Sequence, residues 1–70
     1  MNDQTLARHS VPDEDIELFA TGLFRARGIA ARDVALERAK GFRDAGDFEG
    51  HNVWKDVADR VTKFRNRPAS

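Results

Sequence analysis

The amino-acid sequence predicts an all-α fold, in the form of a small three-helix domain with a tight junction between the second and third helices at Gly46-Asp47. The chain has 70 residues, of which 40% are apolar, and this is enough for one domain at most. Three segments repeat apolar residues at spacings of three and four, as amphipathic helices do. Gly28, Gly46 and Pro68 follow these segments and are typical helix terminators.

The first helix is expected over about 11–27. We expect Ser10 to cap its first turn, where Pro12 is tolerated and a run of acidic residues complements the helix dipole. Gly28 is the expected C-terminal stop. The residues that share the apolar face are Ile16, Phe19, Ala20, Leu23 and Phe24.

The second helix is expected over about 30–45. Its apolar stripe is rich in alanine, so a neighbouring helix can pack close to it. The stripe consists of Ala31, Val34, Ala35, Ala39 and Phe42. Gly46 can adopt the left-handed conformation that ends a helix, and Asp47 can then cap the next helix at once.

The third helix is expected over about 48–66. Its seam is Val53, Val57, Val61 and Phe64, flanked by Trp54 and Ala58, and Gly50 falls on the same seam. A chain this short has a thin stability margin, so we expect the large side chains to supply the core. These are Phe19, Phe24, Phe42, Phe48, Trp54 and Phe64. Residues 10–66 then form the domain, between a flexible tail at 1–9 and a C-terminal tail at 67–70.

The segment from Glu17 to Arg67 resembles a family of short, uncharacterised helical proteins from proteobacterial genomes. The resemblance rests on an Ala-Gly-Asp-x-x-Gly-x-x-x-Trp motif that ends at Trp54, on Glu17-Leu18-Phe19-Ala20 and Glu37-Arg38 before it, and on Val57-Ala58 and Val61 after it. This sequence differs from the family pattern in its shorter first-helix end at Arg27-Gly28. The resemblance implies a helical fold and a bacterial origin, and it brings no activity with it.

No catalytic or metal-binding pattern is present in the sequence. The chain has no cysteine, its two serines lie toward the ends, and no glycine-rich phosphate loop occurs. His9 and His51 are too few for a zinc site, and we expect both to be solvated. Asp47 fits a helix cap better than a calcium loop. We therefore expect a non-enzymatic, cytoplasmic protein that needs no cofactor.

Arg38 falls inside the apolar arc of the second helix, between Val34 and Phe42. A charge in that position must pair with an opposite charge or extend to solvent. One hypothesis is a salt bridge to Asp15 or Asp56. The other is a guanidinium group that is presented to a carboxylate of a partner protein.

Leu18 lies opposite the core face of the first helix, beside Gly22 and Arg25, where it can form a shallow pad for another helix. If Phe48 is exposed as well, the domain has two apolar spots that suggest self-association or a protein partner. We therefore interpret the chain as a protein-interaction module, an adaptor or modulator. Its expected contact residues are Leu18, Arg25 and Arg38.

A nucleic-acid partner is the alternative hypothesis. The helices on either side of Gly46-Asp47 could form a helix-turn-helix with the third helix as reader. The C-terminal end carries a run of bases that could bind phosphates weakly, namely Arg60, Lys63, Arg65 and Arg67. However, 12 basic and 12 acidic residues give a net charge of zero, and bases at a helix C-terminus also complement the dipole.

Overall fold

The computed structural model describes residues 9–66 of the chain, and all of their regular structure is helical. Most of the expected tails, 1–8 and 67–70, lie outside the described residues. The elements in chain order are α1 (Asp13–Arg27), the 3-10 turn η2 (Gly28–Ala30), α2 (Ala31–Asp44) and α3 (Phe48–Arg65). No helix among the described residues is long and apolar enough to cross a membrane.

The expected break between the first two helices is absent, so the count of three separate helices was wrong. No loop separates the helical elements between Asp13 and Asp44, so the described residues form two helical segments, the first of them jointed at Gly28, where the backbone leaves helical dihedral angles (φ 59°, ψ −131°). Gly28 has φ 59° and donates its N–H to the carbonyl of Phe24, as a helix terminator does. The chain then enters η2 directly, and the N–H of Ala31 donates back to the Gly28 carbonyl. Gly28 therefore bends the first segment without a loop.

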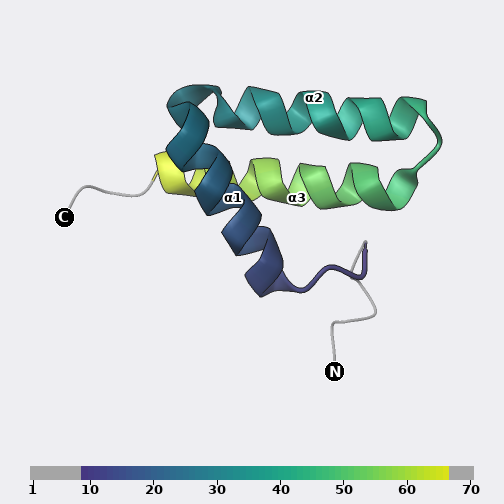
Figure 1. Ribbon diagram of the computed structural model, residues 1–70, viewed down its shortest axis with the longest axis horizontal. Helices are drawn as coiled ribbons and strands as arrows, with labels where there is room; N and C mark the ends of the chain where they lie inside the picture. Colours follow the sequence, from purple (N-terminus) through teal and green to yellow (C-terminus); the bar gives the residue numbers. More distant parts are fainter. Residues whose placement is uncertain (1–8, 67–70) are drawn as a thin grey trace.

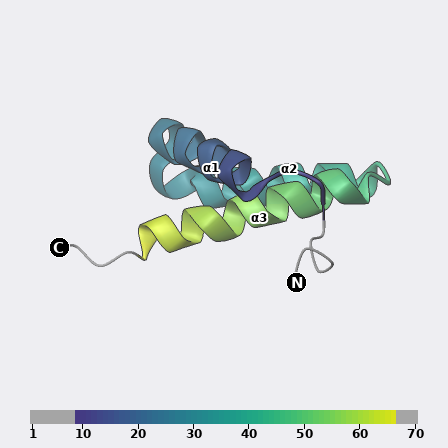
Figure 2. The ribbon, with the colours of Figure 1, turned by 90° about the horizontal axis from the view of Figure 1, so that it is seen from below.

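α2 and α3 run antiparallel and side by side, and α1 crosses them at a steep angle (Figure 1). Seen from below, α1 lies on one side of the layer that α2 and α3 form (Figure 2). The largest interface in the domain is the one between α2 and α3, and α1 makes more of its contacts with α3 than with α2. One side of α1 is therefore turned away from the rest of the domain.

The junction between α2 and α3 is a Schellman motif followed by a side-chain cap. Gly46 has φ 84°, and its N–H donates to the carbonyl of Arg43. The N–H of Asp47 donates to the carbonyl of Phe42 over 2.8 Å, which is the longer-range of the two hydrogen bonds that define the motif. The Asp47 carboxylate then accepts from the N–H of Gly50 at 2.9 Å and caps α3. The predicted left-handed glycine and capping aspartate are both confirmed.

The core consists of small and β-branched side chains. Only one buried residue is larger than valine. The buried set is Ile16 and Ala20 of α1, Ala31, Ala35 and Ala39 of α2, and Val53, Val57, Ala58 and Val61 of α3. Alanine on α2 lets the backbone of α3 approach closely, as the sequence predicted.

The expectation that the aromatic residues supply the core was wrong in part: Phe24, Trp54 and Phe64 pack against the core, but smaller side chains fill its centre. None of them is fully buried, and Phe19, Phe42 and Phe48 are 46%, 38% and 64% exposed. The reason is the close approach of the helices, which leaves room for methyl groups but not for rings. Gly50 shows how tight the contact is, because a β-carbon there would lie 2.7 Å from Cδ1 of Phe42. The rings therefore pack along the edges of the core.

We expect the Gly46→Ala variant to lower the free energy of unfolding by about 1–2 kcal/mol, because a β-carbon disfavours the left-handed backbone. Gly41→Ala is the matched control. Gly41 lies within α2 and is exposed, and no atom lies within 4 Å of the position that a β-carbon would take there. Alanine at that position should therefore add about 0.5–1 kcal/mol of helix stability. Urea denaturation followed by circular dichroism measures both changes. Equal effects of the two substitutions would contradict the assignment of the junction.

Candidate functional site

Trp54 is the centre of a small stack of side chains contributed by α1, α2 and α3. The ring of Phe19 from α1 lies parallel to the indole, with centroids 6.4 Å apart and 15° between the planes. The guanidinium carbon of Arg38 from α2 lies 5.2 Å from the centroid of the same ring, within the range of a cation–π contact. Phe19, Arg38 and Trp54 are called the Trp54 stack below.

Arg38 thus occupies a position that neither sequence hypothesis described in full. Its side chain is exposed and rests on Trp54. None of the ion pairs between described residues includes Arg38, and Asp56, one of its two expected partners, instead contacts His9. Stacking on the indole neutralises none of the arginine's charge, so the guanidinium can still meet a carboxylate from another molecule.

A groove in α2 begins at Arg38 and runs toward the junction. It has a volume of about 310 Å³ and is lined by Arg38, Gly41, Phe42 and Ala45, with almost entirely apolar walls. Gly41 contributes no side chain, and this keeps the floor of the groove open. The ring of Phe42 packs against Gly50, and Phe42 as a whole is 38% exposed. Together with the Trp54 stack, this α2 groove forms one cationic and aromatic surface.

Leu18 and Arg25 lie on a different surface, the outer face of α1. Both are exposed, Leu18 by 67%, and they are about two helical turns apart on the same side of the helix. Arg25 also lines an open groove of about 320 Å³ together with Glu17, Thr21, Phe24 and Phe64. The expected exposure of Leu18 is confirmed, and Phe48, expected in the core with the other aromatic residues, meets the alternative condition of being exposed. The three expected contact residues do not converge on a single site, because Arg38 belongs to the surface around Trp54.

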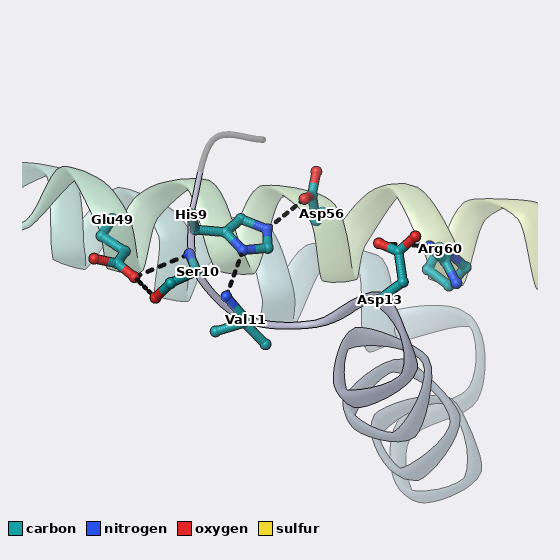
Figure 3. Close-up of polar contacts among 7 residues, drawn as sticks. All are labelled: His9, Ser10, Val11, Asp13, Glu49, Asp56 and Arg60. Atoms are coloured by element: carbon teal, nitrogen blue, oxygen red, sulfur yellow. Dashed lines mark hydrogen bonds and ion pairs between the residues drawn. The ribbon is translucent and has the colours of Figure 1, made fainter. Parts of the chain in front are cut away.

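His9 is not solvated, contrary to the sequence prediction. Its side chain is only 4% exposed, and Nε2 lies 2.5 Å from the carboxylate of Asp56 on α3 (Figure 3). The N–H of Val11 points at Nδ1 from 3.1 Å, so Nδ1 accepts and Nε2 carries the proton that is donated to Asp56. A lone histidine in a polar N-terminal stretch carries no sequence signal for this contact, which joins residues 47 positions apart.

Ser10 also has a different partner from the one expected. It does not cap α1, whose N-cap is Pro12 without any side-chain hydrogen bond. Instead, the hydroxyl and the N–H of Ser10 both donate to one carboxylate oxygen of Glu49, at 2.5 and 3.2 Å (Figure 3). Residues 9–12 therefore run along α3 before α1 begins. These hydrogen bonds hold the pKa of the Glu49 carboxyl below its ordinary value, the hydroxyl contributing most.

His51, the second histidine expected in solvent, is half-buried at the start of α3. Its Nδ1 lies 3.0 Å from the carbonyl of Ala39, so this nitrogen donates to α2 and helps to hold the two helices in register. Across the described part of the chain, no group of three or more His, Asp or Glu side chains is placed to hold a metal ion.

The basic C-terminal end is only partly available to a ligand. Arg60 is bound through its guanidinium to the carboxylate of Glu17. It also lies 4.0 Å from the carboxylate of Asp13 (Figure 3), and the two contacts tie α3 to α1. Lys63 and Arg65 are exposed, and Arg67 lies outside the described residues. In addition, α2 and α3 lie antiparallel along their lengths (Figure 1), whereas the helices of a helix-turn-helix cross at roughly 90–120°.

No family model matches the chain, and no curated protein or solved structure does so either. The resemblance to short proteobacterial helical proteins therefore stays a prediction.

We expect the contact between residues 9–12 and α3 to depend on pH. Because folding lowers the pKa of Glu49, its contribution to stability is present above the ordinary pKa of a glutamate and is lost as the pH falls through the lower, folded-state value. The chemical shift of the Ser10 amide in an NMR titration from about pH 6 to about pH 2 measures this loss. The Glu49→Gln variant should not show that transition. An identical titration in both proteins would contradict the assignment.

Proposed function

We propose that the protein is a non-catalytic interaction module, an adaptor or modulator that binds another protein through the Trp54 stack and the α2 groove. One observation carries this proposal. The fully buried side chains are mostly alanine and valine, whereas Phe19 and Phe42 of this surface are 46% and 38% exposed and Trp54 is only half-buried. Exposed apolar side chains that adjoin one another and are bordered by a charged group mark sites of interaction.

The chemistry of this surface favours a particular kind of partner segment. The α2 groove offers apolar walls beside Phe42, and Arg38 stands at its edge with a guanidinium that no described carboxylate neutralises. A segment with an apolar side chain next to an aspartate or glutamate complements both features. Trp and Arg are among the residue types most enriched in the energetically dominant contacts of protein interfaces.

The rival proposal, nucleic-acid binding by the basic C-terminal end, has less support. It needs several basic side chains that are free on one surface, and Arg60 is already bound to Glu17 of α1. The two remaining exposed bases among residues 9–66 of this end, Lys63 and Arg65, could neutralise only about two phosphates, which gives weak binding that fades as salt is added.

Affinity capture from the native lysate, with and without nuclease, tests the proposal. We expect a stoichiometric protein partner that survives nuclease treatment. We expect Arg38→Ala and Phe42→Ser to reduce its recovery at least tenfold, about the loss that one important contact residue causes. Arg43→Ala is the matched control, because Arg43 is an exposed arginine on another side of α2 and should leave recovery unchanged.

Trp54 supplies an independent readout, because it is the only tryptophan in the chain. Once the partner is identified, its addition should change the Trp54 emission of the wild-type protein and of the Arg43→Ala variant. Retention of the partner by both the Arg38 and Phe42 variants would overturn the choice of surface. Loss of all recovered material upon nuclease treatment would favour the nucleic-acid rival instead.

A further inference from the structure

The outer face of α1 carries a row of four side chains, most of which are exposed to solvent. Glu14, Leu18, Thr21 and Arg25 follow one another at spacings of four, three and four residues, which places them on one side of the helix. Three of the four are exposed, and Thr21 is half-buried. Figure 2 shows α1 at the outside of the domain, with α2 and α3 together on its other side.

The charges on this row are opposite in sign and symmetrically placed. Glu14 and Arg25 form no ion pair with any described residue, whereas Glu17, on the neighbouring side of α1, is bound to Arg60. Glu14 and Arg25 are 11 residues apart, or about 16 Å along the helix axis. The midpoint between them falls between Leu18 and Thr21.

We propose that this face binds a second copy of the chain, through an antiparallel pairing of two α1 helices about a twofold axis. In the register that places Glu14 opposite Arg25 of the second copy, Leu18 lies opposite the second copy's Thr21, and each contact occurs twice. A parallel pairing would bring like charges together at both ends, so the charge pattern selects the antiparallel one. This inference concerns a different face from the Trp54 surface and does not depend on the proposed function.

Gly22 has a role in this arrangement that it lacks in the monomer. It lies in the middle of α1, is exposed, and has no atom within 4 Å of the position a β-carbon would take. A glycine in the middle of a helix is unfavourable for the isolated domain. In the antiparallel register it lies next to the Leu18–Thr21 contact, where the missing side chain leaves room for the leucine of the second copy.

The contact is small, which sets the conditions of the test. A pair of 15-residue helices buries less than the roughly 1,600 Å² of a standard interface, so we expect weak, reversible and salt-sensitive association. Sedimentation equilibrium of the full chain from about 10 μM to about 1 mM at low salt covers the relevant range. Absence of dimer over that range would overturn the proposal.

A charge exchange is the decisive experiment. Glu14→Arg and Arg25→Glu each replace two attractive pairs across the twofold axis with two repulsive ones, and each should raise the dimer Kd about tenfold or more. The double variant restores opposite charges at both positions and should return the Kd to within about threefold of wild type. Single variants that dimerise as well as wild type would refute the pairing, as would a double variant that fails to recover.

A change in the stability of the monomer cannot explain recovery of the dimer Kd in the double variant. Glu14 is in the acidic first turn of α1 and Arg25 in the basic last turn, so each exchange opposes the helix dipole. The double variant therefore has the least favourable α1 helix and still is the one expected to dimerise. Circular dichroism of each variant establishes that it is folded at the concentrations used.

Apolar variants identify the face independently. Leu18→Gln and Gly22→Gln should each raise the dimer Kd, while Phe48→Gln, which alters an equally exposed ring at the start of α3, should not. Association that is lost with Phe48→Gln and kept with Leu18→Gln would place the interface elsewhere and overturn the proposal. Arg38→Ala should leave the dimer Kd unchanged, and the charge-exchange variants should still capture a protein partner, so failure of one proposal is distinct from failure of the other.

Discussion

The close approach of α2 and α3 is the constraint on which the rest of the structure depends. Ala31, Ala35 and Ala39 bring the two helix axes together, and Gly50 extends the contact to the junction by admitting the ring of Phe42. A narrow interface excludes aromatic side chains from its centre. The rings then lie at its edges, and this displacement produces the aromatic and cationic surface around Trp54.

Polar contacts, as much as apolar ones, fix the position of α1. Only Ile16 and Ala20 of this helix are fully buried, a small area for orienting a 15-residue element. Arg60 binds Glu17 on one side, and the residues that precede α1 are held on α3 by His9 and Ser10. Three acidic side chains, Glu17, Glu49 and Asp56, are thus used in contacts within the domain.

Local chemistry made part of the structure predictable. The roles predicted for Gly46 and Asp47 were correct, because a left-handed glycine and a capping aspartate interact only with residues a few positions away in the chain. The valine seam of α3 was correct because helical periodicity is also local. The bend at Gly28 was misjudged, since glycine terminates the hydrogen-bond pattern of α1 whether or not a loop follows, and the sequence does not distinguish a 3-10 turn from a break.

The contacts that the sequence did not predict join residues that are distant from each other in the chain. His9 meets Asp56 and Ser10 meets Glu49 only because residues 9–12 run along α3, a path that depends on the crossing of α1. Arg38 was correctly singled out as a charge in an apolar arc, but its position on Trp54 depends on the register between α2 and α3. Leu18 was correctly expected to be exposed, because helical phase alone places it opposite the core face of α1, whereas Phe48 was wrongly counted among the core residues.

The small core also links stability to binding. A chain of 70 residues that buries mainly alanine and valine gains little from each buried side chain, and its large apolar groups contribute fully only when something covers them. A ligand that binds only the folded state raises the free energy of unfolding by mass action. The Trp54 stack holds Arg38 and Phe19 in place before any partner arrives, which lowers the conformational entropy lost on binding. If the proposed function is correct, the packing that leaves these rings at the surface also makes them available to a partner, and that contact would stabilise the fold that positions them.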